Sequence, residues 1–472
     1  MEPVSLQFVV ESTGARPARA PAGNTLFRSV STDSRTCPAD SLFVAIRGEK
    51  FNGNEFAPAA LQNGAGGVLV APGAAQSDRN YNDHIFNERT VLEHPSPEQA
   101  LLQLAKRYRD QYSIPIVGVA GAAGKTTTKE ITAHLLKSLG PIVASEKSFN
   151  NSIGVPHTLF KIEKSTRAAV VEIGTNSKGE VAALAAVVSP TLGIITVIAE
   201  EHLEGLGDLD GVCREEGALL DVLPAGGIAF LNADDHYYPI LRKRARSKVV
   251  TFGIENAADF SAKDILFHIA GCSFKVQGRA ATVPLLGTHN VYNALAAIAI
   301  ATTLGVPLDE SLHLLADMKP PHRRLERKRF GDVEIIDDCY NANPGSVRAA
   351  IRALEGLRNG RRRIFVLGKM HELGAKSSEL HTEIGREIGR ARFDMFIAIG
   401  AESRELVKGA VDAGMSAGAI IQFPSAADAQ YHIPEIVKDG DLVLVKGSRA
   451  EGLERIIDAL RARFEPREEG HL

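Results

Sequence analysis

The stretch over residues 117–130, with the sequence VGVAGAAGKTTTKE, constrains the fold of this chain more than any other segment. The apolar run 114–119 predicts a buried parallel strand, and the glycine-rich segment 121–124 predicts a turn. Lys125 and the threonines after it then predict the start of a helix. Strand, turn and helix in this order are typical of a phosphate-binding loop.

The residue types of this loop suit a nucleotide. Backbone N–H groups can face an anion where no side chain blocks them, Lys125 brings a positive charge, and the Thr126 hydroxyl suits Mg²⁺. The strict motif places a glycine six residues before the lysine, where this chain has Val119, so the match is to the shorter form G-x-x-G-K-T. The alternative is a glycine turn that binds nothing. The residues expected to contact a nucleotide are Gly121, Ala122, Ala123, Gly124, Lys125, Thr126 and Thr127.

A chain of 472 residues is too long for one ordinary core. Apolar strands alternate with helices over most of its length, which favours open, mostly parallel sheets covered by helices. We expect an α/β protein with a small N-terminal α/β domain (1–112), a central phosphate-loop domain with a mostly parallel sheet (113–317) and a C-terminal open α/β domain of Rossmann-like type (318–472). The expected strands are 41–46, 67–70, 114–119, 168–173, 192–198, 227–231, 248–252, 333–338, 363–367, 395–399 and 441–445, with a β-rich piece at 265–285.

Charge and cysteine content exclude several classes of protein. The formal net charge of −3 does not favour nucleic acid or a membrane surface as a partner. The uncharged segments 181–199 and 291–308 resemble membrane spans, but Ser-Pro at 189–190 splits the first and the second ends as a packed helix does. Four widely spaced cysteines and the absence of a signal peptide predict reduced thiols and a cytoplasmic location.

Several polar residues follow the predicted strands, where open α/β sheets bind ligands. Glu172 can hold a metal bound to the phosphates, or it is a solvated strand-end carboxylate. His202 follows the next strand and can ligate a metal or orient a phosphate, although a lone loop histidine is more often plain surface.

The C-terminal domain has two further polar segments of this kind. Asp338 and Asn341 stand in an acidic and amide-rich segment that suits a sugar or base, or only an Asx-rich helix cap. Lys446 and Arg449 suit a carboxylate or phosphate, with an ordinary cap as the alternative.

Taken together, these segments resemble the Mur ligase family over nearly the whole chain. The resemblance is carried by GAAGKTTTKE at 121–130, NNSIGVP at 150–156, EIG at 172–174, HLEGLG at 202–207 and GTHNVYNALAA at 287–297, and by RLE at 324–326, DDCYNANP at 337–344 and KGSR at 446–449. Within the family, NNSIGVP and HLEGLG are most similar to the members that join D-alanyl-D-alanine to UDP-N-acetylmuramoyl-tripeptide.

The first domain supports this resemblance. STDSR at 31–35 and RGEKFNG at 47–53 resemble the family's uridine-nucleotide segments, although Asn-Gly-Asn at 52–54 replaces the usual Asp-Gly-His. The planar guanidinium of Arg35 can bind a diphosphate, and the hydroxyl of Ser34 can donate a hydrogen bond to it.

The resemblance implies an ATP-dependent amide ligase with Mg²⁺, in which a substrate carboxylate becomes an acyl phosphate and an amine then displaces phosphate. It implies a UDP-substrate domain, an ATP-binding domain and a ligase domain in this order, and we expect a monomer. The implied catalytic and metal residues are Lys125, Thr126, Glu172, His202 and Glu216. The implied nucleotide contacts outside the loop are Asn290, Asn293, Arg324, Asp338 and Asn341, and the implied substrate contacts are Ser34, Arg35, Asn150, Asn151, Lys446 and Arg449.

Three positions depart from the family pattern. Glu216 stands where the family usually has a lysine carbamylated by CO₂; Lys369 replaces a carboxylate, and Cys339 replaces a serine. A glutamate keeps the negative charge of the carbamate on a shorter side chain. Two other hypotheses stay open. One is a related ligase with another substrate, such as a polyglutamate-adding enzyme, against which the uridine segments of the first domain argue. The other is a weakly active homologue that binds nucleotide as a regulator or scaffold, which only Glu216 and Lys369 support.

Overall fold

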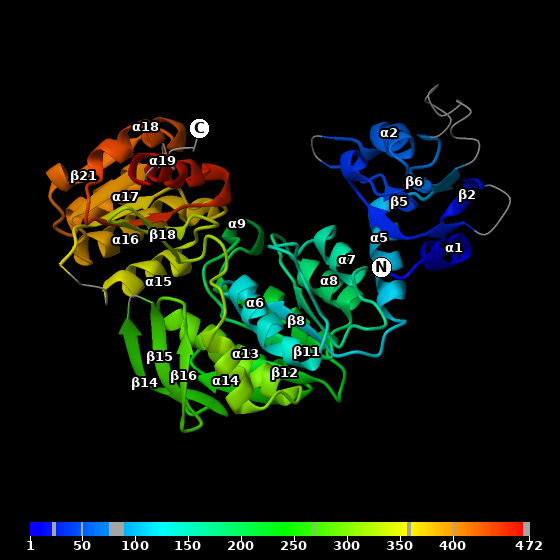
Figure 1. Cartoon of the computed structure of the whole chain (residues 1–472), viewed down its shortest axis with the longest axis horizontal. Coiled ribbons are helices and arrows are strands. Elements are labelled where there is room, and N and C mark those ends of the chain that lie inside the picture. Colours follow the sequence, from blue (N-terminus) through cyan, green and yellow to red (C-terminus); the bar gives the residue numbers. More distant parts are fainter. Residues whose placement is uncertain are drawn as a thin grey trace, which may run out of the picture.

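The computed structural model describes residues 1–20, 25–48, 51–74, 89–268, 270–355, 360–400 and 403–465. Their strands form three large sheets and one small pair, β1 (Val4–Ser5) with β3 (Leu26–Phe27). In Figure 1 the N-terminal sheet lies at the upper right, the central sheet below the middle, and the C-terminal sheet at the upper left. The predicted class, α/β with three domains, is confirmed.

The N-terminal sheet has five strands in the order β2-β7-β6-β5-β4. All pairs are parallel except the one between β2 and β7 at the edge. Its strands and helices are β2 (Arg16–Arg19), β4 (Ser29–Ser31), β5 (Ser41–Val44), β6 (Gly67–Val70), β7 (Thr90–Glu93), α1 (Leu6–Thr13), α2 (Ala57–Gln62) and α5 (Pro97–Arg109). Helix α5 begins where Ser96 accepts a hydrogen bond from the backbone of Gln99 and Pro97 occupies the first turn.

The same helix α5 ties this sheet to the centre of the molecule. The Tyr108 hydroxyl donates to the carbonyl of Ile162, and the Arg109 guanidinium donates to the carbonyls of Val188 and Ser189. The exact domain boundary at 112/113 stays a prediction.

The central sheet has nine strands in the order β16-β15-β14-β13-β12-β11-β8-β10-β9. It is parallel from β9 to β14, and β14, β15 and β16 form an antiparallel extension. The strands are β8 (Ile116–Ala120), β9 (Ile142–Ala144), β10 (Ala168–Glu172), β11 (Leu192–Ile195), β12 (Ile228–Asn232), β13 (Lys248–Gly253), β14 (Phe260–His268), β15 (Gly271–Val276) and β16 (Arg279–Val283).

Helices cover both faces of this sheet. Val117 and Val119 of β8 pack in one hydrophobic cluster with α6 (Lys125–Leu136) and α13 (Thr288–Thr303), while Ile116 and Ala120 pack in the cluster on the other face. Burial on both faces explains why these strands read as continuous apolar runs. The remaining helices here are α7 (Gly154–Leu159), α8 (Glu180–Val188), α9 (Leu203–Leu206), α10 (Leu209–Glu216), α11 (Ala218–Val222), α12 (Tyr238–Arg244) and α14 (Leu308–Ala316).

The C-terminal sheet has six strands in the order β17-β18-β22-β19-β20-β21, parallel except for β17. Its last strand in sequence, β22 (Leu442–Lys446), lies between β18 and β19 in the middle of the sheet. The other elements are β17 (Glu326–Phe330), β18 (Val333–Asp338), β19 (Arg363–Leu367), β20 (Met395–Ile399), β21 (Ile420–Phe423), α15 (Pro344–Glu355), α16 (Ser377–Arg390), α17 (Ser403–Asp412), α18 (Ala426–Ile436) and α19 (Glu454–Phe464).

The two uncharged segments belong to this globular core. The first is divided between α8 and β11, with Pro190 in the break, and the second lies mostly in the buried helix α13. Within the described ranges, no helix combines the length and apolar character needed to cross a membrane. The cysteines Cys37, Cys213, Cys272 and Cys339 are buried free thiols, as predicted.

Candidate active site

The glycine-rich turn connects the end of β8 to the first residue of α6. Gly121 and Gly124 have φ of +119° and +83°, which side-chain-bearing residues rarely adopt. A Cβ on Gly121 would lie 2.2 Å from Thr196 Oγ1, and one on Gly124 would lie 2.5 Å from Asn293 Oδ1. Both glycines are therefore required by backbone conformation and by close packing.

Lys125 is the first residue of α6, and its ammonium faces back into the turn. Its Nζ donates to the carbonyl of Gly121 at 2.5 Å and to Glu201 Oε2 at 3.0 Å. Although burial disfavours the charged form, the carboxylates of Glu201 and Glu216 raise the pKa of Lys125. A charged ammonium is thus held beside the loop that would receive the phosphates.

Glu216 ends α10 and reaches the same turn. Its Oε2 accepts a hydrogen bond of 2.7 Å from the backbone N–H of Gly121, and its side chain is buried. Burial raises the pKa of Glu216, which the nearby Lys125 ammonium partly offsets. Glu216, which stands where the resemblance implies a carbamylated lysine, therefore brings its carboxyl group to the phosphate loop.

Glu172 stands at the carboxyl end of β10, beside β8. Its Oε1 accepts a hydrogen bond from Asn150 Nδ2 at 3.0 Å. Its Oε2 is buried and accepts no hydrogen bond from any described residue, with Lys129 Nζ 3.9 Å away. An unsatisfied buried carboxylate oxygen is unusual and suits a bound cation.

The Thr126 hydroxyl lies in the first turn of α6. It accepts a hydrogen bond of 2.9 Å from Arg324 Nη2 and lies 3.3 Å from Ser148 Oγ. Among the described residues, no three His, Cys, Asp or Glu side chains gather closely enough to form a metal site by themselves. Mg²⁺ keeps several waters and binds phosphate oxygens, so the Thr126 hydroxyl and the free oxygen of Glu172 still fit it.

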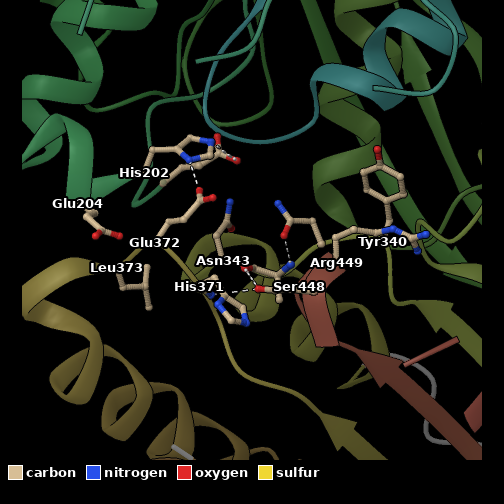
Figure 2. Close-up of a pocket in the computed structure, with 13 residues that line it drawn as sticks. His202, Glu204, Tyr340, Asn343, His371, Glu372, Leu373, Ser448 and Arg449 are labelled. Carbon is tan, nitrogen blue, oxygen red and sulfur yellow. Dashed lines mark hydrogen bonds and ion pairs between the residues drawn. The ribbon is translucent and has the colours of Figure 1, made fainter. Parts of the chain in front are cut away.

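His202 caps α9 with φ of +52°, and its Nδ1 is paired with the Glu372 carboxylate of the C-terminal domain (Figure 2). Its Nε2 lies 3.7 Å from Glu201 Oε1. These residues form part of a cavity of about 560 Å³ between the central and C-terminal domains. The cavity is lined by Glu201, His202, Glu204, Tyr340, Asn341, Ala342, Asn343, His371, Glu372, Leu373, Ser448, Arg449 and Ala450.

The polar residues of the C-terminal domain meet at the ends of β18 and β22. Lys446 is buried, and its Nζ donates to Asp338 Oδ2 at 2.6 Å and to the carbonyl of Asn341 at 2.9 Å. Lys446 thus binds both Asp338 and Asn341, the two residues expected near a ribose. The expected contact of Lys446 with a peptide stays a prediction. Arg449 lines the cavity, is 59% exposed and lies 3.0 Å from Glu454.

The two asparagines of α13 are buried against the phosphate loop. Asn293 Oδ1 accepts a hydrogen bond from Thr128 Oγ1 at 3.1 Å, and its Nδ2 donates to Asn290 Oδ1 at 2.9 Å. Asn290 in turn donates to the carbonyl of Leu286. The bond from Thr128 joins α13 to α6, and the predicted contact of both asparagines with adenine stays a prediction.

The other predicted substrate residues lie on different elements. Ser34 and Arg35 are in a short 3₁₀ turn of the N-terminal domain, where the exposed Arg35 pairs with Asp33 at 2.7 Å. Asn151 lies just before α7, and its Oδ1 accepts hydrogen bonds from the backbone N–H groups of Ile153 and Gly154. Its contact with the substrate stays a prediction.

A second cavity of about 580 Å³ lies in the N-terminal domain. Arg47, Asn52, Asn54 and Glu98 are among the residues that line it. Two residues of the predicted uridine segment, Glu49 and Lys50, lie outside the described residues. The cavity is thus lined by Arg47 and Asn52 of that predicted segment.

Reasoning from the sequence missed Glu201, Lys129 and Glu372 as members of the site. Glu201 directly precedes His202, and this position next to a predicted site residue could have identified it. The fully buried Lys129 lies one helical turn after Lys125 and donates to the carbonyls of Ser145 and Lys147. The sequence does not indicate that Lys129 is buried, because the polar threonines around it give this part of the helix no clear apolar face.

Three family models match the chain: "Mur ligase family, catalytic domain" over 27–109, "Mur ligase middle domain" over 119–301 and "Mur ligase, glutamate ligase domain" over 323–449. The UDP-N-acetylmuramoyl-tripeptide–D-alanyl-D-alanine ligase of Escherichia coli is 32% identical over 92% of this chain and 93% of its own length. The chain belongs to the Mur ligase family. The ligase of the same name from Bacillus subtilis is 31% identical over the same shares of the two chains.

Solved structures of Mur ligases agree with this assignment. A MurF crystal structure from Acinetobacter baumannii has a TM-score of 0.87 at 27% identity, covering 98% of this chain and 99% of that one. MurF from Thermotoga maritima in complex with ADP has a TM-score of 0.78 at 25% identity, covering 93% and 98%. This Mur ligase therefore shares its whole three-domain arrangement with MurF structures.

Proposed function

We propose that this Mur ligase joins D-alanyl-D-alanine to UDP-N-acetylmuramoyl-tripeptide with hydrolysis of ATP to ADP and phosphate, in the synthesis of peptidoglycan precursors. The observation that carries the proposal is the Lys125 ammonium on a glycine turn beside a cavity shared by two domains. Relatives that carry this ligase name align over 92% of the chain.

The first step of the reaction forms an acyl phosphate. The terminal carboxylate of the tripeptide attacks the γ-phosphorus of ATP, and the bond to the β,γ-bridging oxygen breaks to release ADP. Such chemistry asks the protein mainly for positioning and for stabilisation of charge. Lys125 and Arg324 would face the transferring phosphate, and the N–H groups of the turn would cradle the others.

Mg²⁺ would be held by Thr126 and Glu172, with Glu216 and His202 toward a second ion, and would neutralise charge on the phosphate oxygens. The chain's own part is to keep these ligands in place. Asn150 orients Glu172 through its amide, and Glu372 orients His202 from the C-terminal domain.

In the second step the amine of D-alanyl-D-alanine attacks the acyl carbon. The new amide bond forms, phosphate leaves, and the amine loses a proton. Arg449 and Ser448 line the cavity where the dipeptide would lie, and Arg449 suits its carboxylate.

The N-terminal domain, about 1–112, would hold the UDP part of the substrate through Ser34 and Arg35, while Asn150 and Asn151 would contact the tripeptide. The central domain, about 113–317, would bind ATP, with Asn290 and Asn293 toward adenine. Asp338 and Asn341 of the C-terminal domain, about 318–472, would reach the ribose, and Lys446 would support them. We further propose a monomer in the cytoplasm, without nucleic acid as a partner.

The direct test is phosphate release on mixing ATP, Mg²⁺, D-alanyl-D-alanine and UDP-N-acetylmuramoyl-tripeptide. The assay is run with the diaminopimelate and the lysine forms of the tripeptide, and the product is identified by mass. Release that requires all substrates supports the proposal. Release with glutamate and a folate in their place would favour a polyglutamate-adding ligase, and nucleotide binding without turnover would favour a regulatory homologue.

A further inference from the structure

We propose that Glu201 is a positioning residue that competes with the phosphates of a bound nucleotide for the Lys125 ammonium. This inference rests on the proposed ATP site. Glu201 lies outside the motifs by which the chain resembles its family, immediately before the HLEGLG run. Its role therefore has to be argued from its contacts.

The first step of the argument is the pair itself. Glu201 Oε2 lies 3.0 Å from Lys125 Nζ, and each side chain is only 11% exposed. A charge-assisted hydrogen bond in so little solvent is considerably stronger than a surface ion pair. Since an ammonium has three N–H donors, a phosphate oxygen can reach Lys125 while this bond is present, but the Glu201 carboxylate competes with it for the positive charge.

The second step is that Lys125 is held from two sides. The carbonyl of Gly121 accepts its other hydrogen bond at 2.5 Å, and the N–H of Gly121 donates to Glu216. The ammonium and the first N–H of the turn are thus both hydrogen-bonded to carboxylates of the protein. Those are the groups that a phosphate-binding loop presents to its ligand.

The third step concerns where Glu201 goes when it is released. It belongs to the segment between β11 and α9 and lines the cavity between the two domains, together with His202. A phosphate that takes the Lys125 ammonium leaves the Glu201 carboxylate facing this cavity, where water can solvate it. The exchange therefore needs only side-chain movement, without a change in the sheet or in α6.

The alternative role for Glu201 is a direct Mg²⁺ ligand, and the two roles predict opposite effects on nucleotide affinity. If Glu201 competes with the phosphates, its neutralisation tightens binding. If it holds the metal, its neutralisation weakens binding in Mg²⁺. Titration calorimetry with ADP, in EDTA and in Mg²⁺, separates the two.

We expect Glu201→Gln to bind ADP roughly tenfold more tightly than the parent, because one competing charge has been removed. Glu201→Asp keeps the charge but shortens the side chain, so its affinity should lie between the two. Glu204→Gln is the matched control: it removes one charge from the same cavity wall at an exposed position. Its effect measures the contribution of net charge alone.

A double-mutant cycle assigns the effect to the pair. In a Lys125→Ala background, Glu201→Gln should lose most of its tightening. Release of a fluorescent ADP analogue, followed by stopped flow, should be slower from Glu201→Gln, since Glu201 no longer helps to recapture Lys125.

Affinity of Glu201→Gln that is unchanged, weaker in Mg²⁺, or no different from the Glu204→Gln control would overturn the inference. So would equal tightening with and without Lys125. A parent protein that binds no ADP at all would overturn the proposed function as well. If the parent protein binds ADP and all variants bind it with the same affinity, only the role of Glu201 is overturned.

Discussion

At the scale of single residues, the phosphate loop is a place where charges compensate one another. Lys125 is surrounded by Glu201, Glu216 and Glu172, and all three carboxylates raise its pKa. Burial lowers the pKa of Lys125, but the carboxylates more than offset this effect, so the ammonium stays protonated at physiological pH. Lys125 is therefore available as a cation whenever a phosphate displaces its partners.

Replacing Lys125 tests that role directly. We expect Lys125→Ala to lower the rate of phosphate release by about a hundredfold or more, since a preorganised charge on the transferring group is lost. Thermal unfolding of the variant should show that the fold is intact. Turnover near the parent's rate in a folded Lys125→Ala protein would contradict the proposed site.

Glu216 combines two tasks that substitutions can separate. Glu216→Gln keeps an oxygen to accept the N–H of Gly121 but loses the charge, so we expect a near-normal melting temperature and a raised Mg²⁺ requirement. Glu216→Ala loses both, and leaving a buried N–H without a partner costs about 1–3 kcal/mol of stability. Activity of the parent should not depend on bicarbonate, because a glutamate needs no carbamylation.

The measurement is a Mg²⁺ titration of initial rates, with and without bicarbonate, alongside melting curves. Glu215→Gln is the matched control. Glu215 is also buried, and it accepts the N–H groups of Gly179 and Val181 rather than that of Gly121. A Glu216→Gln titration that coincides with those of the parent and of the control would end the idea of a metal role.

At the scale of elements, the phosphate loop depends on helix α13, which is far away in sequence. We expect Gly124→Ala to lose most ADP affinity, because the new Cβ would meet Asn293 Oδ1 at 2.5 Å and push the loop from α13. Gly179→Ala is the control: its φ of +89° is similar, it also caps a helix, and a Cβ there meets nothing within 4 Å. Both variants should lose about 1 kcal/mol of stability from backbone strain, but only the first should lose affinity in a calorimetric titration. Equal affinities would show that the packing on Asn293 does not matter.

The same elements show what a sequence can reveal. Strands buried on both faces, such as β8 and β10, were predictable because their apolar runs are uninterrupted. The short strands β9 (Ile142–Ala144) and β21 (Ile420–Phe423) were not predicted, since they lie at sheet edges and their residues are mostly half-buried. Their pairing comes from the neighbouring strand rather than from a local pattern.

The candidate active site, like the strands, was predictable in part. Lys125 and Glu172 follow from strand, turn and helix order, and the structure brings them together as expected. The contacts of Glu201 and Glu372 were not predictable, because the first depends on the rotamer of one loop residue and the second crosses between domains. The burial of Lys446 is a further case, since its partner Asp338 is 108 positions away.

At the scale of the whole molecule, polar contacts join the central and C-terminal domains. Arg324 donates to Thr126, and Arg348 Nη1 lies 3.3 Å from Glu200 Oε2. A nucleotide on the phosphate loop would meet Arg324 from one domain and Lys125 from the other. We expect these domains to move closer together when it binds, with the linker near 320–324 as the hinge.

Small-angle scattering checks this expectation. The radius of gyration should fall when a non-hydrolysable ATP analogue and UDP-tripeptide are both present. The tripeptide without nucleotide is the control and should leave it nearer the value of the free protein. A radius that stays constant in all mixtures would count against closure.

The place of β22 has a consequence for how the chain is made. A ribosome makes the N-terminal sheet, the central sheet and the other five strands of the C-terminal sheet before Leu442–Lys446 exists to separate β18 from β19. Until then those two strands have unpaired edges in the nascent chain, which invite pairing with other chains. A message cut short before codon 442 would yield a product with an intact phosphate loop, no Lys446 and a C-terminal half that cannot close. Closure of the C-terminal sheet would thus wait for the strand that is made last and lies in its middle.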